Sequence, residues 1–354
     1  MNYSLGFWIF ARITGLAYLC AFLSLLPQIP GLLGPNGILP AENLLTRVTE
    51  FIGVNFAPLS LPTLTWFFGS SDLSLRLIAL LGIAGALALT AGLLRPLSAI
   101  LPWLCWLSFV NIGQDFLSFQ WDTLLLEVGF LLIFLEKPGL RPRPPGLDIP
   151  PLLIRLALTF LLARLIFSSG IVKLLSGDPT WADLSAMTYH FETQPIPNPL
   201  SWFIHQLPHP LLKLSTIFTF VIELFLPFTL LFPQTRVRLT ASLGFLSLML
   251  LIALTGNYAF FNLLTIALCL TLIDNRFFPT SLLPNSVPLP WTPVPWRHLA
   301  SLAALLQLSL AIPILLSTLQ LLPRASQSTW QNSFAPWHLT SGYGLFAVMT
   351  TRRP

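Results

Sequence analysis

The sequence predicts an all-α protein of the polytopic membrane class: a helical bundle of about nine spans with a polar cap on its extracytoplasmic side. Of its 354 residues, 55% are hydrophobic and only 9% are charged, and the mean hydropathy is +0.77. An ordinary soluble domain carries about 25% charged residues. The basic residues are scattered singly over short connections, which is typical of membrane orientation signals and excludes a nucleic-acid surface.

The first apolar stretch, residues 5–26, is predicted to be a span and not a cleavable signal peptide. It is longer than a signal-peptide core, and it ends in Pro27-Gln-Ile-Pro30 where a cleaved signal would show small residues. Each of the three cysteines (Cys20, Cys105 and Cys269) lies in an apolar run without a C-x-x-C pair. We therefore expect them to pack as small apolar side chains and not to exchange disulfides.

Apolar windows of about twenty residues place the other spans. The predicted set is 5–26, 73–94, 96–112, 119–136, 152–175, 211–232, 237–255, 258–274 and 298–322. Residues 1–322 would thus form the transmembrane domain, with an outer cap loop at 176–208. Residues 323–354 would form an extracytoplasmic tail.

Basic residues follow the even-numbered spans and predict the orientation. They are Arg95, Lys137, Arg141, Arg143, Arg236, Arg238, Arg276 and Arg297. Because short cytoplasmic loops are rich in Lys and Arg, these connections are expected to be cytoplasmic. The N-terminus is then cytoplasmic, and the cap and the C-terminal tail are extracytoplasmic.

Three charged residues lie deep in predicted spans. Arg164 falls in the fifth span, and burying it alone would cost several kcal/mol. Glu127 in the fourth span and Glu223 in the sixth are the candidate partners. We favour structural ion pairs among these three over a transport role, and Arg12 could join them from the first span.

Lys173 ends the fifth span at its outward side. A lysine at a partly dry membrane face can become a base or nucleophile, or it can anchor the helix at the interface. In the chemical alternative the catalytic residues would be Lys173, Asp122 and Glu192, with one of the two acids orienting the lysine. From spacing alone, the anchor is favoured.

The loop after the fifth span gathers most of the candidate binding residues. They are Asp178, Trp181, Asp183, Tyr189, His190, Gln194, Pro195, Pro197, Asn198 and Pro199. A single His beside a Glu is a weak acid–base signal, and no second His stands at metal-ligand spacing, so no metal site is predicted. The prolines favour a rigid extended strap after residue 193.

Several stretches resemble the lipase maturation factor family, in the same order along the chain. The most specific is Glu192-Thr-Gln-Pro-Ile-Pro-Asn-Pro199, preceded by Gly177-Asp-Pro-Thr-Trp181. Gln120-Trp-Asp122, Gly256-Asn-Tyr258 and Tyr343-Gly-Leu-Phe346 agree as well.

This resemblance implies a polytopic protein that, in animals, sits in the endoplasmic reticulum membrane and assists folding and assembly of secreted lipases. Its partners would be membrane lipids and exported clients such as lipases. It also implies a soluble domain after the last span, of which this chain would carry only the start. The Pro-rich, loop-poor sequence favours a bacterial member, for which the inner membrane would replace the reticulum.

A weaker resemblance concerns Gly170-Ile-Val-Lys173, which is similar to the helix end that carries the reactive lysine of vitamin K-dependent γ-carboxylases. The lipase maturation factor family is thought to share a helical core with these enzymes and with DoxX-like proteins. Only Lys173 corresponds. The leading hypothesis is a maturation factor without a cofactor. An integral-membrane enzyme with Lys173 as base and a bound quinone or lipid is the first alternative. A transporter using Arg164, Glu127 and Glu223 is the second, although the sequence shows no inverted repeat.

Overall fold

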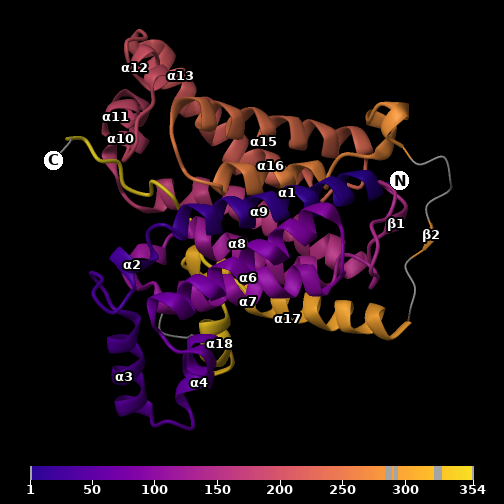
Figure 1. Ribbon diagram of the computed structural model, residues 1–354. Coiled ribbons are helices and arrows are strands. Elements are labelled where there is room, and N and C mark those ends of the chain that lie inside the picture. The colour runs from indigo at the N-terminus through magenta and orange to yellow at the C-terminus, as the bar shows by residue number, and fades with distance from the viewer. Residues whose placement is uncertain (1, 284–288, 291–293, 323–328, 353–354) are drawn as a thin grey trace.

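The apolar helices run side by side in a bundle (Figure 1), and the part of the chain that the structure describes contains nine of them. The computed structural model describes residues 2–283, 289–290, 294–322 and 329–352. The bundle consists of α1 (Ser4–Leu25), α6 (Asp72–Ala91), α7 (Leu97–Ile112), α8 (Gln120–Ile133), α9 (Leu152–Leu175), α13 (His209–Phe220), α15 (Thr235–Thr255), α16 (Phe261–Leu270) and α17 (Val294–Thr318). Each predicted span coincides with one of them, which confirms the all-α membrane bundle.

These helices differ in how readily they cross a membrane. Among the described residues, six are long and apolar enough to span it: α1, α6, α9, α15, α17 and the combined helix His209–Thr229. The combined helix consists of α13, the π-helical segment η2 (Val221–Phe225) and α14 (Leu226–Thr229). The shorter α7, α8 and α16 pack inside the bundle, where Cys105, Leu125 and Leu264 are fully buried. The protein is therefore an integral, multi-pass membrane protein.

Small residues set the closest helix contacts, as is usual between membrane helices. At Gly6 of α1, a Cβ atom would lie 2.2 Å from the backbone oxygen of Leu270 in α16. At Gly15, a Cβ atom would lie 2.8 Å from the backbone nitrogen of Thr90 in α6. The first helix therefore packs tightly against both neighbours.

The short elements gather at the two ends of the bundle. Opposite the N-terminus lie α2 (Ile29–Leu32), α3 (Ala41–Ile52), α4 (Ala57–Ser60), α10 (Pro179–Ala182), α11 (Ala186–Thr193) and α12 (Pro199–His205), together with the C-terminus (Figure 1). The other short elements are α5 (Thr65–Phe68), η1 (Gln114–Leu117), η3 (Asn275–Phe277), η4 (Thr280–Leu282), α18 (Thr329–Phe334) and η6 (Ala335–Trp337). The strands β1 (Asp148–Ile149) and β2 (Leu289–Pro290) pair in parallel near the N-terminus (Figure 1). The loop predicted as a cap thus contains three short helices, α10 to α12.

Arg12 lies at the N-terminal end of the bundle and not in the cluster around Arg164, so that expectation is wrong. It donates to Glu136 Oε1 at 3.0 Å and to the carbonyl oxygen of Leu89 at 3.2 Å. Nearby, Asp148 binds Lys137 at 3.2 Å. These charges are therefore paired with one another instead of reaching into the centre of the bundle.

Candidate functional site

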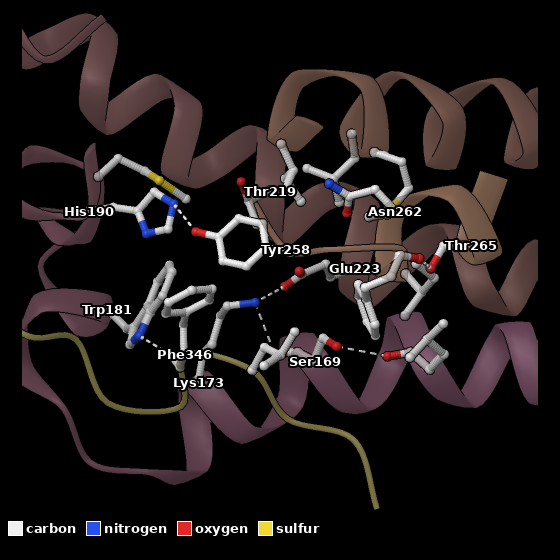
Figure 2. Close-up of a pocket in the computed structure, with 18 residues that line it drawn as sticks. Ser169, Lys173, Trp181, His190, Thr219, Glu223, Tyr258, Asn262, Thr265 and Phe346 are labelled. Carbon is white, nitrogen blue, oxygen red and sulfur yellow. Dashed lines mark hydrogen bonds and ion pairs between the residues drawn. The ribbon is translucent and has the colours of Figure 1, made fainter. Parts of the chain in front are cut away.

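A cavity of about 80 Å³ lies between α9, α15, α16 and η2, beneath the cap. Its lining is mostly apolar, with polar side chains at a few positions (Figure 2). Those polar residues include Lys173, His190, Glu223, Tyr258 and Asn262. An enclosed apolar space with a few polar groups is the usual form of a small-molecule site.

Lys173 and Glu223 form a buried ion pair in this cavity (Figure 2). The Lys173 ammonium lies 2.5 Å from Glu223 Oε2 and donates to the backbone carbonyl of Ser169 at 3.0 Å. It also lies 5.2 Å from the centre of the Trp181 ring, within range of a cation–π contact. The two charged side chains are only 5% and 7% exposed, so the lysine does not reach outward as an interfacial anchor.

Local backbone features bring the two charges together. Glu223 lies in the π-helical segment η2, and such wider turns are frequent at functional sites. Opposite it stands Gly170 of α9, where a Cβ atom would lie 2.8 Å from Glu223 Cβ. The missing side chain lets α9 approach η2 closely enough for the ion pair to form.

Neither acid expected to orient Lys173 contacts it. Asp122 is buried at the start of α8, and its Oδ2 atom has no hydrogen-bond partner among the described residues. Glu192 is exposed on the cap, where its carboxylate lies 3.6 Å from His205 Nε2. The acid that contacts Lys173 is instead Glu223, which the π-helical turn directs toward the end of α9.

Arg164 pairs with Glu127, the first of its two predicted partners, and both side chains are buried. Glu127 also accepts hydrogen bonds from the Gln307 amide and, at 2.7 Å, from the Tyr343 hydroxyl. Arg164 donates in addition to the Thr340 hydroxyl. The pair thus joins α8, α9, α17 and the C-terminal segment of residues 338–352.

Asp178 and Trp181 hold this C-terminal segment against the cap. Asp178 Oδ1 accepts from Thr180 at 2.8 Å and caps α10, while Oδ2 accepts from the Met349 backbone N–H at 2.5 Å. The Trp181 indole donates to the carbonyl oxygen of Phe346 at 3.0 Å. Burial raises the pKa of Asp178, but the hydrogen bonds from Met349 and Thr180 outweigh it, so the net pKa is lowered and the carboxyl stays ionised.

The Gln194–Asn198 part of the family motif ties the cap to the end of α15. Gln194 donates to the carbonyl oxygen of Thr255 at 2.7 Å and accepts from the Tyr258 hydroxyl at 3.0 Å. Asn198 donates to the carbonyl oxygen of Leu254 at 2.8 Å, and Pro197 forms a backbone bridge with Gly256. The predicted non-helical strap is present, and it lies across the α15–α16 connection.

Gly256 permits this close approach. A Cβ atom at this position would lie 2.3 Å from Gln194 Oε1 and 2.7 Å from the Tyr258 ring. The two motifs Glu192–Pro199 and Gly256–Tyr258 therefore contact each other, although about sixty residues separate them in the sequence.

His190 and Tyr189 face inward as well. The His190 Nε2 atom lies 3.5 Å from the Tyr258 hydroxyl, and its ring meets the Phe346 ring edge-on with centres 4.9 Å apart. Burial, with a smaller contribution from Lys173, lowers the pKa of His190 to about 4, so the imidazole is neutral at pH 7. Tyr189 packs against the cluster around Trp181.

The remaining candidate binding residues, Asp183, Pro195 and Pro199, are exposed on the cap. Asp183 accepts from the Ser185 backbone N–H at 2.8 Å. Hydrogen bonding with the Ser185 side chain, and next with its backbone, lowers the pKa of Asp183. Pro199 begins α12, where a missing N–H costs nothing. No group of three His, Cys, Asp or Glu residues that could hold a metal occurs in the described part of the chain.

Two polar residues of this arrangement, Gln307 and Asn262, were not among the candidates chosen from the sequence. Gln307 binds Glu127, and its signal was present as a lone amide in the last apolar span. Asn262 lines the cavity from α16, and its signal was likewise a lone amide in an apolar span. Single amides within apolar helices therefore merit the same attention as single charges.

Comparison with known proteins places this arrangement in a family. A family model described as the lipase maturation factor transmembrane domain matches residues 6–280. Lipase maturation factor 2 from Mus musculus is 42% identical over 313 residues, which cover 82% of this chain and 43% of the relative. The same protein from Homo sapiens is 40% identical over 312 residues, again 82% and 43%. Lipase maturation factor 1 from Mus musculus is 32% identical over 279 residues, 76% of this chain and 48% of the relative.

The chain spans less than half the length of these relatives. No solved structure matches it significantly. The family match covers most of the bundle and the whole cap with its motif residues. The chain therefore belongs to the lipase maturation factor family.

Proposed function

We propose that this protein is a membrane-embedded factor that assists the maturation of exported lipases. The observation that carries the proposal is the 42% identity to lipase maturation factor 2 over 82% of the chain. The residues that tie the cap and the C-terminal segment to the bundle, among them Trp181 and Gln194, are present and make their contacts. The membrane-embedded core that the relatives share is thus assembled in this chain.

The charge network supports a scaffold better than a transport pathway. Glu127 is bound at once by Arg164, Gln307 and Tyr343, from three different parts of the chain. A carrier site must release and rebind its charges, whereas a network with this many partners fixes the packing of its helices. Transport is therefore not the function we propose.

The test is the specific activity of a secreted lipase in cells that lack their own lipase maturation factors. Cells would carry the wild-type chain, the Gln194→Leu variant, the matched exposed variant Gln206→Leu, or an empty vector. We expect the activity per mass of secreted lipase to rise severalfold with wild type and with Gln206→Leu, and less with Gln194→Leu. If cells that carry the wild-type chain in their membranes gave the same activity per mass of secreted lipase as cells with the empty vector, the proposal would be contradicted.

We also propose that the N-terminus is cytoplasmic and that the cap and the C-terminal segment are extracytoplasmic. Near the N-terminal end of the bundle, Arg95 forms a backbone bridge with Gly139, and Lys137 and Arg143 both bind Asp148. The cap lies at the opposite end (Figure 1). Cytoplasmic connections are enriched in such residues.

In a variant whose native cysteines are removed, we expect a membrane-impermeant maleimide to label Asp183→Cys in intact cells. Arg236→Cys should react only after permeabilisation, and the reverse pattern would refute this orientation.

A further inference from the structure

We propose that the cavity beside the Lys173–Glu223 pair binds an uncharged, membrane-soluble molecule that carries a hydroxyl group. This site goes beyond lipase maturation, and it does not depend on that function. Four properties of the cavity lead to it: a buried amide oxygen without a partner among the described residues, a spare N–H donor on Lys173, a neutral balance of charge, and an apolar lining between membrane helices.

Asn262 supplies the first property. Its side chain lines the cavity, the residue is 6% exposed, and its Oδ1 atom has no hydrogen-bond donor among the residues that the structure describes. Burying an amide oxygen without a partner is unfavourable, because the oxygen loses its hydrogen bonds to water. The two threonine hydroxyls of the lining bond within their own helices, since Thr219 donates to the carbonyl oxygen of Ser215 and Thr265 to that of Phe261. Asn262 therefore presents an unused acceptor to whatever fills the cavity.

Lys173 supplies a donor on the same lining. An ammonium has three N–H groups, and the described contacts of Lys173 with Ser169 and Glu223 use two of them. A ketone or an ether could engage only this donor, and an ammonium only the Asn262 acceptor. A hydroxyl group can engage either, and it is smaller than an amine or an amide that can do the same, which suits a cavity of about 80 Å³.

The charge balance excludes an ionic ligand. Lys173 and Glu223 neutralise each other, and His190 is uncharged because it is buried. A carboxylate or an ammonium entering this space would lose its hydration without a free counter-ion. The ligand is therefore uncharged.

The body of the ligand follows from the apolar lining. Leu165, Ile166, Leu248, Met249, Ile252 and Phe261 contribute to it from α9, α15 and α16. Phe346 and Trp181 close the cavity on the side of the cap (Figure 2). Because these helices lie in the membrane, a slender hydrocarbon chain can extend from the cavity while the hydroxyl end is held inside.

The test uses octanol that carries a photoreactive diazirine, with the purified full chain in lipid nanodiscs. We expect saturable labelling of residues that line the cavity and competition by plain octanol. The methyl ether of octanol cannot donate a hydrogen bond, so it should compete about 2- to 10-fold less well, the ratio expected for one lost hydrogen bond. In Asn262→Leu, the ratio between the competition by octanol and the competition by its methyl ether should fall toward one.

A matched pair of variants on α15 locates the site. Ile252→Phe fills the cavity and should abolish the saturable labelling, whereas Leu250→Phe adds the same ring at a 53% exposed position and should retain it. Labelling that does not saturate would mean that water or nothing specific occupies the cavity, and it would overturn the proposal. Equal competition by octanol and its ether in the wild type, or equal labelling of both α15 variants, would overturn it too.

Discussion

Replacing Arg164 by methionine is expected to abolish the yield of folded protein from membranes. The substitution leaves the fully buried Glu127 without its cation, although Gln307 and Tyr343 still donate to it. Breaking one side of a buried ion pair typically costs about 3–5 kcal/mol, which is a large part of the stability of most domains. The measurement is the fraction of protein that elutes as a single species in mild detergent, before and after heating.

A double variant separates the loss of charge balance from the loss of packing. Arg164→Met combined with Glu127→Gln removes both charges and should recover much of the yield, because no ion is left unpaired. Arg236→Met, at an exposed position, serves as the control and should behave as wild type. A normal yield for Arg164→Met alone would show that the pair does not hold the helices together.

Lys173→Met is expected to have the second-largest effect, because it breaks the other buried ion pair. The free energy of unfolding should fall by about 3–5 kcal/mol. The substitution leaves Glu223 buried in the cavity without a cation and removes the contact with the Trp181 ring. From its place at a helix end, Lys173 was expected to anchor the helix at the membrane interface, and replacing an interfacial anchor would change the yield little. The buried pair reverses that expectation, and the same elution assay measures it.

The companion variant, Lys173→Met with Glu223→Gln, distinguishes a structural lysine from a chemical one. Both charges are gone, so the yield should return. If lipase maturation returns with it, the pair is structural, as this account holds. A well-folded double variant without maturation activity would instead assign Lys173 a chemical role.

The bundle could be predicted because a span needs little more than length and hydropathy. All nine windows coincide with helices, and the resemblance to the family rested on residues that are now seen in contact. The choice of partner for Arg164 could not be predicted, since Glu127 and Glu223 lie at similar depth. That choice depends on how the helices are rotated about their axes, and the hydropathy of a span carries little information about rotation.

The partner of Lys173 depended on a feature that the sequence hides. Nothing in Val221–Phe225 indicates a π-helical turn, which directs Glu223 toward α9. The cap shows a related limit, because Gln194 and Asn198 looked like surface binding residues, whereas their side chains bind the end of α15. The composition of the cap marks it as an unusual polar segment. It does not show whether the polar side chains face the solvent or the helices beneath.

We infer that the motif residues fasten the cap and the C-terminal segment over the bundle. The most direct test is amide hydrogen exchange of α11 and of residues 343–349 in wild type, Gln194→Leu and Gln206→Leu. We expect both segments to be protected in wild type and in Gln206→Leu. In Gln194→Leu, which leaves Thr255 and Tyr258 without their partner, both should exchange about tenfold faster or more. Unprotected segments in wild type, or unchanged exchange in Gln194→Leu, would contradict the claim.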